Sequence, residues 1–572
     1  MKIKILFSLF FIFIIACQKG QFATIGDVGE DPFFPFAWHI QNLGQRFFDQ
    51  GKGLPGYDIQ AANAFRQGLT GKGVHILISD TGIDYTHPDL AKNHSYGTSL
   101  NFGSCIHSFY PNCELNNNQY APPLQLNDQN TKNNDLETEA HGTEVAGVIA
   151  ALERNQIGSR GIAPRATISA SNFLSRGFMN NTALGNFSTA QKSQMSEKYD
   201  IINQSWGKSS NQEISYISDS MLETINTMIS NGRNGNGTIL VRAAGNYNQA
   251  EDQGQAVNSI FEGYNNTPYS INVGALNARG LGAWYSLSGA NLWITAPGGD
   301  DQIAGIVTTD ISGCINGESN KLTNIEEKSD FQIGKFGNGE CNYSDSFIGT
   351  SAAAPVVTGA IALILEKYPN LNWREVKYVL AASATQIDKK HEGWQENAAD
   401  LGPDLKLRFH HKYGFGALNV DGALELAKNV SNKGFQSGLI MTEDSDIKKN
   451  LNLNNIFNND DYFTFDVTSE IPVFSVQLRI DTNDFVDTNT NKKSICDVKE
   501  LEIKITSPSN TVSILTTGTD ALYSTNYNNA ILLTNHFFQE QSQGTWKVKI
   551  SDRNTSNSTT CTINELQLLV GI

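Results

Sequence analysis

Three residues of the sequence could together carry out nucleophilic attack on a carbonyl carbon. Asp80 follows the apolar run GVHILIS, His141 opens the segment HGTEVAGVIAA, and Ser351 lies in FIGTSAAAP. A serine hydroxyl is a weak nucleophile at neutral pH, so an imidazole must take its proton and later pass it to the leaving group. An aspartate can hold that imidazole in the required tautomer. Taken alone, the Ser351 segment is typical of an ordinary helix start, because serine and proline both favour first turns.

A fourth residue could stabilise the charge that develops during such an attack. Asn246 follows the strand-like run TILVRAAG. Its amide and the backbone N–H of Ser351 could bind the oxyanion of a tetrahedral intermediate, and losing one such donor typically costs about 100-fold to 1000-fold in rate. The small residues around Ser351 would leave room for a substrate backbone. The order Asp, His, Ser differs from the orders in α/β-hydrolases and in chymotrypsin-like enzymes.

These residues need a scaffold that brings strand ends together, and residues 31–430 are predicted to provide it. Short apolar segments alternate there with helical patterns, as in an α/β domain with a mostly parallel sheet. The expected strands are GVHILISD, TISASNF, YDIINQSW, GTILVRAAGN and SINVGAL, and the expected helices are HGTEVAGVIAALE, SDSMLETINTMISNG, SAAAPVVTGAIALILEKY and WREVKYVLAASA. On an open α/β sheet, functional groups gather at the carboxyl ends of the strands.

Residues 431–572 have a different pattern. Segments such as VFSVQLRI, TVSILT and GTWKVKISD alternate apolar and polar residues and are separated by turn residues. This pattern predicts an all-β sandwich or barrel. A stretch rich in Asn and Ser, near residues 431–460, separates it from the α/β domain.

The composition limits the partners. A chain of 572 residues favours two or three domains. The net charge is −16 and no basic cluster stands out, so nucleic-acid binding is not expected, because phosphate neutralisation needs concentrated Lys and Arg. We expect a monomer.

The N-terminus predicts export. Lys2 and Lys4 precede an apolar run, residues 5–16, which is too short to span a bilayer. A basic start followed by a short apolar run is typical of a secretory signal peptide, here residues 1–16. Residues 17–30 would then form a linker.

The stretch IIAC, which ends at Cys17, resembles a bacterial lipobox. The resemblance implies cleavage before Cys17 and attachment of lipid to it, whereas a plain signal peptide with an incidental cysteine is the alternative. Gln18 after the cysteine favours the outer membrane of a Gram-negative bacterium. We therefore expect a lipid-anchored protein of the cell envelope or cell surface.

Export also bears on the other six cysteines, an even number that suggests disulfides in an oxidising compartment. Six cysteines allow fifteen pairings. The nearest-neighbour set keeps each bridge within one loop or domain, and it pairs Cys105 with Cys113, Cys314 with Cys341, and Cys496 with Cys561. No cysteine or histidine spacing suggests zinc.

The segments SDTGID, HGTEVAGVIA, NQSWG, RAAGN and GTSAAAP resemble the subtilases, over roughly residues 31–430. DPFFPFAWHIQNLGQ, NLNWREVKYVLAASA, HHKYGFGALNVDGALELA and the C-terminal domain resemble the kexin-like branch, with SPSNTVSIL and GTWKVKISD similar to the P domain of proprotein convertases. The resemblance implies a seven-stranded parallel sheet flanked by helices, then a β-sandwich P domain over residues 431–572. It also implies a serine endopeptidase acting on proteins or peptides through Asp80, His141 and Ser351, with Asn246 in the oxyanion hole.

The resemblance also assigns the substrate cleft. Ser205, Trp206 and Gly207 would form one wall, although a strand end with a buried tryptophan is the structural alternative. Glu262 stands where kexin-like enzymes hold an aspartate at the bottom of the pocket for the residue before the cut. A carboxylate there would favour Arg or Lys through charge-assisted hydrogen bonds, unless Glu262 is a solvated loop acid.

The sequence departs from the kexin-like pattern in three ways. Only thirteen residues separate Cys17 from Asp31, too few for the inhibitory pro-segment that usually assists folding, so we expect folding to be self-sufficient or assisted in trans. Thr81 and Thr138 replace acids of the neighbouring subsite, and SWGKSSNQ lacks the acidic cluster after the tryptophan. We therefore expect no strict requirement for two basic residues.

The resemblance implies structural calcium, held by three side chains and by carbonyls of the loop LERNQIGS. The three side chains are Asp58, Asp89 and Asn155. Oxygen ligands of this kind suit a hard cation, although solvated polar residues are the alternative. A second calcium site of kexin-like enzymes is expected to be broken, because Asp252 matches it but Ser210 and Leu287 replace carboxylates.

A second function class stays open at this point. The chain could be a surface adhesion or scaffolding protein that retains the fold, binds through the β domain and carries a vestigial triad. The loss of a triad member would favour this alternative, and the sequence has lost none.

Overall fold

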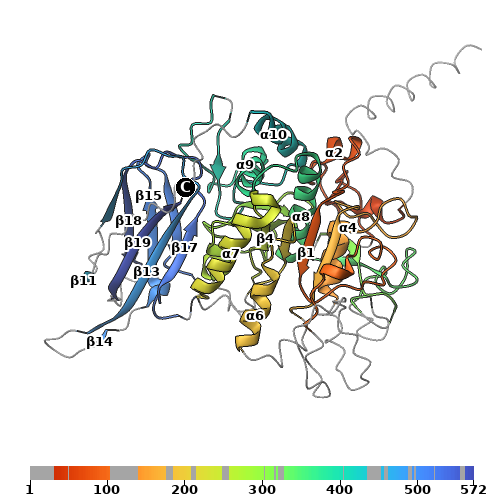
Figure 1. The fold of residues 1–572 in the computed structure, drawn as a ribbon, viewed down its shortest axis with the longest axis horizontal. Helices are drawn as coiled ribbons and strands as arrows, with labels where there is room; N and C mark the ends of the chain where they lie inside the picture. The colour runs from red at the N-terminus through yellow and green to blue at the C-terminus, as the bar shows by residue number, and fades with distance from the viewer. Residues whose placement is uncertain are drawn as a thin grey trace, which may run out of the picture.

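The structure is a computed structural model of the chain. It describes residues 31–48, 51–102, 140–174, 184–207, 214–247, 257–301, 303–314, 317–319, 328–403, 405–433, 453–456, 462–486, 493–494, 497–520, 522, 524–553 and 561–571. Two units are visible in Figure 1, an α/β unit that contains α8 and a block of blue strands at the other end of the molecule.

The α/β unit is built on one parallel sheet with strand order β2-β1-β3-β4-β5-β6. Its strands are β1 (His75–Ser79), β2 (Thr167–Ser171), β3 (Ile201–Gln204), β4 (Ile239–Ala243), β5 (Ser270–Leu276) and β6 (Ile294–Pro297). Every residue of β3 to β6 is buried, as expected for a sheet covered on both faces. The five predicted strands are confirmed, and the four-residue β6 was missed.

The described sheet has six strands, so the expectation of seven is wrong. Residues 94–100 run beside the edge strand β2 but make only isolated parallel bridges, His94 with Ile168 and Leu100 with Ser171. A 3-10 turn at Tyr96–Thr98 lies between the two bridges. This turn interrupts the ladder and prevents a continuous seventh strand.

Helices cover the sheet, and α8 (Thr350–Lys367) packs against β3, β4, β5 and β6. The others are α2 (Ala62–Arg66), α4 (His141–Ala150), α6 (Leu184–Gln194), α7 (Asp219–Asn231), α9 (Trp373–Ser383) and α10 (Val420–Lys433). Within the described ranges, α8 alone is long and apolar enough to cross a membrane, but 83% of that stretch is buried inside the protein. Its apolar character therefore suits a core helix.

Small paired strands complete the α/β unit. They are β7 (Ile306–Thr309) with β8 (Tyr343–Phe347), and β9 (Gln395–Glu396) with β10 (Arg408–Phe409). The β7–β8 pair packs beside α4 and leads into α8. The connection from β7 to β8 contains a disulfide between Cys314 and Cys341, as the nearest-neighbour pairing predicts.

The second unit consists of two antiparallel sheets, as expected for a β-sandwich. One contains β11 (Leu453–Ile456), β13 (Ser475–Val486), β14 (Lys493–Ser494), β17 (Ala530–Thr534) and β19 (Cys561–Gly571). The other contains β12 (Tyr462–Val467), β15 (Leu501–Thr506), β16 (Val512–Thr517) and β18 (Gly544–Asp552). Inward-facing Leu, Ile, Val and Trp side chains of both sheets form one buried cluster.

The two units share a core. Phe474 and Phe538 of the β unit belong to the hydrophobic cluster of the α/β unit. The Phe538 ring lies 4.9 Å from that of Trp293, and the Phe474 ring lies 5.0 Å from that of Trp373. The two units are thus packed together through buried aromatic contacts.

Candidate active site

Asp80 and His141 meet at the carboxyl edge of the parallel sheet. Asp80 directly follows β1 and is fully buried, and His141 is the first residue of α4. His141 Nδ1 lies 2.8 Å from Asp80 Oδ1, and the backbone N–H of Thr81 donates to the same oxygen. The carboxylate thereby fixes which imidazole nitrogen carries the proton, and leaves Nε2 as the base.

The electrostatics of His141 follow from its position. Burial lowers the pKa of the imidazole, but the charge and hydrogen bond of Asp80 raise it, so the pKa lies above its ordinary value. The side chain of His141 remains 29% exposed, and Phe347 packs edge-on against its ring. The imidazole is thus held in place while one face remains accessible.

Ser351 lies in the first turn of α8, and its surroundings are made of small residues. The preceding Gly349 has φ +123°, and a Cβ on it would lie 3.2 Å from the Asn246 amide nitrogen. A side chain at this position would therefore be strained and would press on Asn246.

The Ser351 hydroxyl donates to the Ser205 carbonyl at 2.9 Å. Among the described residues, no hydrogen bond joins this hydroxyl to His141. Catalytic hydrogen bonds are often long or misaligned before substrate binds. Rotation about the Ser351 side chain would be needed to aim the hydroxyl at the imidazole.

Asn246 lies just after β4, beside the start of α8. Its Oδ1 accepts hydrogen bonds from Thr350 N at 2.9 Å and from Thr350 Oγ1 at 2.8 Å. This anchoring fixes the amide and leaves Nδ2 on the Gly349 side, next to Ser351. An amide donor and a helix N-terminus thus converge at one place.

The three residues predicted to form a cleft wall directly follow β3. Trp206 Nε1 donates to the Ser79 carbonyl at 2.9 Å, and the buried Arg242 guanidinium lies 4.9 Å from the Trp206 ring centroid. Ser205 Oγ donates to the Ser351 carbonyl. This wall is therefore joined directly to the nucleophile's helix.

Glu262 lies behind this wall and is only 7% exposed. Its Oε2 would lie 4.0 Å from a Cβ placed on Gly207, so the carboxylate adjoins the cleft wall. Burial lowers the pKa of Arg242, and the charge of Glu262 opposes that effect. The arginine thus already compensates part of the Glu262 charge, a feature that sequence reasoning missed.

Thr81 is not available to form a charged substrate subsite. Its side chain is buried, and its hydroxyl accepts from the Gly142 backbone N–H at 3.0 Å. Thr138, the other replacement, lies outside the described residues, as do Asp252 and Ser210. Leu287 is buried against Val257, so an apolar contact stands at this position.

A buried acid on α4 was also missed. Glu144 is 4% exposed, and its Oε1 has no hydrogen-bond partner among the described residues. Burial and the nearby charges of Glu318 and Asp310 raise its pKa well above the ordinary value. Burial likewise raises the pKa of Asp310 to about 6, against the effect of backbone N–H donors. The helix that carries His141 thus also carries an acid that prefers its proton.

Two of the three predicted calcium ligands come together, with a partner that was not predicted. Asn155 Nδ2 donates to Asp89 Oδ1 at 2.7 Å, and Asp31 accepts from the backbone N–H groups of residues 154–156. Burial raises the pKa of Asp89 to about 7, and the charge of Asp31 adds to this effect. Asp31, Asp89 and Asn155 therefore form one oxygen-rich cluster on the loop 152–159.

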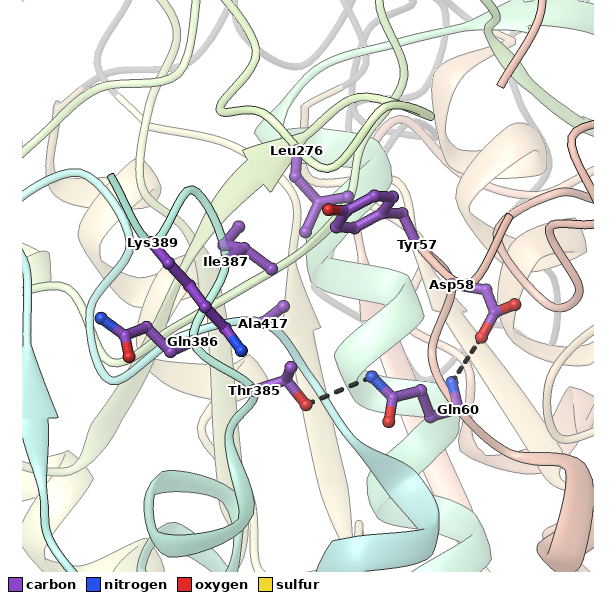
Figure 2. Close-up of a pocket in the computed structure, with 10 residues that line it drawn as sticks. Tyr57, Asp58, Gln60, Leu276, Thr385, Gln386, Ile387, Lys389 and Ala417 are labelled. Carbon is purple, nitrogen blue, oxygen red and sulfur yellow. Dashed lines mark hydrogen bonds between the residues drawn. The ribbon is translucent and has the colours of Figure 1, made fainter. Parts of the chain in front are cut away.

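Asp58 does not belong to this cluster, contrary to the sequence-based assignment. Its two oxygens accept from the backbone N–H groups of Asn42 and Gln60, both at 2.8 Å. Figure 2 shows Asp58 on the wall of a different pocket, which also contains Tyr57, Leu276 and Lys389. The aspartate has a structural role there, because it fixes the turn that precedes α2.

Other predicted residues fall outside the description. Cys17 and the segments 1–16 and 17–30 are not described, and neither are Cys105, Cys113, Cys496 or the side chain of Cys561. Among the described residues, no group of three or more His, Cys, Asp or Glu side chains could hold a metal ion.

A parallel sheet with an Asp–His pair at its carboxyl edge, next to a serine at the start of a buried helix, defines a serine hydrolase with a subtilisin-like fold. The Subtilase family profile matches residues 71–416, and the Proprotein convertase P-domain profile matches residues 488–570. The chain belongs to the subtilase family of serine proteases and carries a P domain. The predicted family, fold class and enzyme class are confirmed.

The relatives agree with this assignment. The extracellular serine protease of Aeromonas sobria is 28% identical, over 92% of this chain and 84% of the relative. Human neuroendocrine convertase 2 is 28% identical over 72% of this chain, which spans 55% of the convertase. The crystal structure of the Aeromonas sobria serine protease has a TM-score of 0.77 at 24% identity and covers 95% of this chain and 96% of that chain. The same protease has also been solved in complex with the chaperone ORF2.

Proposed function

We propose that the chain is an exported, lipid-anchored serine endopeptidase that hydrolyses peptide bonds through Asp80, His141 and Ser351. The observation that carries the proposal is the 2.8 Å contact of His141 Nδ1 with Asp80 Oδ1, beside the N-terminus of the Ser351 helix. An Asp-oriented imidazole next to a serine is the arrangement that nucleophilic catalysis requires.

In the first step, the Ser351 hydroxyl leaves the Ser205 carbonyl and passes its proton to His141 Nε2. The serine oxygen forms a bond to the substrate carbonyl carbon, and the carbonyl π electrons move to its oxygen. His141 then gives the proton to the leaving amine as the C–N bond breaks, which leaves an acyl-enzyme. A water molecule repeats the sequence and releases the acid.

The oxyanion would be stabilised by two donors that are fixed before substrate binds. Thr350 holds Asn246 through Oδ1, so Nδ2 can point toward the reacting oxygen without reorganisation. The backbone N–H of Ser351 is the second donor, and it lies at the positive end of the 18-residue helix α8. Preorganised donors of this kind stabilise the transition state more than the bound substrate.

The pocket for the residue before the cut would be weakly acidic. Glu262 adjoins Gly207, but Arg242 lies close enough to offset part of its charge. We therefore propose tolerance of a basic residue, with a modest preference at most. With Thr81 bound to Gly142, there is no acid at position 81 to attract a second basic residue.

Calcium would be held by Asp31, Asp89 and Asn155 together with carbonyls of the loop 152–159. The donor set fits a hard cation, because carboxylate and amide oxygens gather where two buried acids repel each other. When bound, calcium would supply positive charge that stabilises this loop. The chemistry at Ser351 does not involve it.

Export and lipid attachment rest on the sequence of residues 1–17. The Aeromonas relative is described as extracellular, which supports export. The substrates would be proteins or peptides that reach the cell envelope or surface. Mass spectrometry of the N-terminal peptide would test the lipid on Cys17.

Labelling with a fluorophosphonate tests the catalytic assignment. We expect the reagent to modify Ser351, and we expect Ser351→Ala to abolish both labelling and peptidase activity while the protein stays folded. His141→Ala should label much more slowly, because the hydroxyl has lost its base. Full turnover by Ser351→Ala would refute the assignment, and absence of labelling in the folded wild type would favour a binding protein with a vestigial site.

A further inference from the structure

Half of the large apolar side chains that the structure describes as exposed lie on two neighbouring loops, 42–57 and 277–284. They are Leu43, Leu54, Tyr57, Leu281 and Trp284, each between 36% and 49% exposed, out of ten such residues. Single exposed apolar residues are normal on a protein surface, but a cluster marks an interaction site. We call these five residues the loop patch.

The two loops form one continuous surface. Leu54 N donates to the Ala278 carbonyl at 2.9 Å, and Asn42 Nδ2 donates to the same oxygen at 2.9 Å. Gly280 packs so closely on the Tyr57 ring that a Cβ there would lie 2.1 Å from a ring carbon. These contacts hold the loop patch together as a preformed surface.

Basic side chains surround the loop patch, although the chain has a net charge of −16. The exposed Arg46, Lys52 and Arg279 lie on the same two loops, and Figure 2 shows Lys389 in the pocket that Tyr57 also lines. Within the described residues, none of these four side chains forms an ion pair with a carboxylate. Among the described residues, two acids lie close to the loop patch: Asp301 accepts from Trp284 Nε1 at 3.0 Å, and Asp58 lines the same pocket as Tyr57.

The loop patch also lies next to the point where the described chain begins. Gln45 Nε2 donates to the Pro35 carbonyl at 3.2 Å, and Gln45 Oε1 accepts from Leu43 N at 2.7 Å. Thirteen residues separate Asp31 from Cys17. A fully extended segment of this length spans at most about 48 Å. A lipid on Cys17 would therefore hold this face within reach of a membrane.

We propose that the loop patch docks on an anionic phospholipid surface. Leu and Trp side chains would enter the headgroup region, where aromatic and apolar residues are favoured, and the basic side chains would contact lipid phosphates. The inference rests on the proposed lipid anchor, which keeps the surface close to the bilayer. The anchor would keep the protein at the bilayer, and the loop patch would decide which face of the protein lies against the lipid.

A second copy of the chain fits this surface less well. In a two-fold symmetric contact the same patch would face itself, which would bring Arg46, Lys52 and Arg279 toward their own symmetry mates. Such like-charge contacts are unfavourable. An anionic surface complements both the apolar centre and the basic surroundings.

Docking would place the catalytic cleft close to the lipid. Trp284 precedes Tyr285, whose hydroxyl accepts from Gly349 N at 2.9 Å, two residues before Ser351. The loop patch is therefore connected to the start of α8 through a short chain of contacts. Substrates that are themselves membrane-bound would be presented to the serine at high local concentration.

Vesicle sedimentation of residues 17–572 carrying Cys17→Ser tests the loop patch without the lipid and without the apolar signal segment. We expect binding to vesicles of phosphatidylethanolamine and phosphatidylglycerol, weaker binding to phosphatidylcholine, and loss of affinity in high salt. The double variant Leu54→Ser, Leu281→Ser should bind at least about tenfold more weakly. Its hydrolysis of a soluble peptide should stay unchanged, because neither residue belongs to the active site.

The matched control is Tyr462→Ser, Val512→Ser, which removes two apolar side chains that are 55% and 36% exposed on the P domain. It should bind vesicles like the parent protein. Equal binding by both double variants would overturn the proposal. A second outcome would also overturn the proposal. In it, the parent protein is a dimer, the patch variant is a monomer, and the two bind vesicles equally. If mass spectrometry found no lipid on Cys17, the proposed anchor would be refuted. The sedimentation result for the loop patch would still stand, because sedimentation uses unlipidated protein.

Discussion

Ser351 and Ser205 bind each other through two reciprocal hydrogen bonds. Ser351 Oγ donates to the Ser205 carbonyl, and Ser205 Oγ donates to the Ser351 carbonyl, both at 2.9 Å. The second bond has a simple cause four residues later in the helix. Pro355 has no N–H to offer the Ser351 carbonyl, which is therefore free to accept from Ser205. The proline thus helps to join the nucleophile's helix to the cleft wall.

Replacing Asn246 tests the oxyanion hole next to this pair. Asn246→Asp retains the oxygen that accepts from Thr350 but removes the Nδ2 donor. We expect kcat to fall about 100-fold to 1000-fold or more with a small change in KM, because the donor acts on the transition state. The melting temperature should change little, since the bond to Thr350 remains. A loss confined to KM would show that Asn246 only binds substrate.

The proposed catalytic residues could be picked out of the sequence because each lies in its own local motif. Asp80 ends an apolar strand and His141 starts a helix of small residues, so the sequence placed both at element ends without any knowledge of distances. The order of the motifs along the chain then restricted the choice of fold. The local sequence pattern was sufficient to locate these candidate residues, because each of them lies within one short segment.

The residues that were missed depend on contacts between distant segments. Asp31 reaches the loop 152–159 because Phe33 N donates to the Gly158 carbonyl at 2.7 Å, across more than a hundred residues. Sequence spacing carries no information on such a contact, and Asp58 was chosen in its place. Arg242 was read only as part of a buried strand, and its proximity to Glu262 depends on the loop after β4.

The missed elements have physical explanations too. The four-residue β6 ends at Pro297 and offers no alternation, because all of its residues are buried. The helix α6 has the sequence LGNFSTAQKSQ, in which apolar residues are too few to mark one face. β6 forms because its neighbours cover it, and tertiary packing overrides its weak local pattern.

Glu144 predicts how stability depends on pH. Its folded-state pKa is raised well above the ordinary value, chiefly by burial and then by Glu318 and Asp310. The folded protein therefore binds this proton more tightly than the unfolded chain, and stability falls as pH rises above the ordinary glutamate value of about 4.3. Glu144→Gln removes the ionisable group, so it should be more stable than wild type at neutral pH and less sensitive to pH. Urea unfolding at several pH values measures this, and parallel pH dependences would contradict it.

The aromatic contact between the two units predicts a large effect of the P domain on heat resistance. Phe538 packs on Trp293 within the main core, so Phe538→Ala should lower the free energy of unfolding by about 3–5 kcal/mol. A chain that ends at Lys433 should lose both Phe538 and Phe474 and should aggregate. Tyr462→Ala, at an exposed site on the same domain, is the control and should have little effect. A truncated chain as heat-resistant as the whole protein would contradict the prediction.

Calcium should stabilise the folded protein through the loop 152–159. We expect added calcium to raise the melting temperature and EDTA to reverse this, since saturation at 100 times Kd contributes about 2.7 kcal/mol. Asp31→Asn should remove the calcium-dependent shift, whereas Asp58→Asn should keep it, because Asp58 lies in a different pocket and not beside Asp89 and Asn155. If Asp58→Asn removed the shift and Asp31→Asn kept it, the ligands would be Asp58, Asp89 and Asn155, as predicted from the sequence.

The electrostatic influence of Arg242 and Glu262 on each other predicts the cleavage specificity. Because the guanidinium offsets part of the carboxylate charge, wild type should prefer Arg over Leu before the cut only modestly, and a second basic residue should add little. Glu262→Gln should lower the Arg-to-Leu ratio of kcat/KM by up to about tenfold, since a charge-assisted hydrogen bond is lost. Arg242→Met should raise the same ratio, because the opposing positive charge is removed and the carboxylate charge can act in full on a substrate cation.

A peptide library that varies the two positions before the cut, read by mass spectrometry, gives all of these ratios in one experiment. Arg242→Met removes a buried cation that also binds Asn265, so its melting temperature must be measured beside its activity. The ratio of two substrates on the same enzyme does not depend on how much of the sample is folded. A strict requirement for two basic residues would contradict the role given to Thr81. A ratio that is unchanged in both Glu262→Gln and Arg242→Met would place this pair outside the substrate pocket.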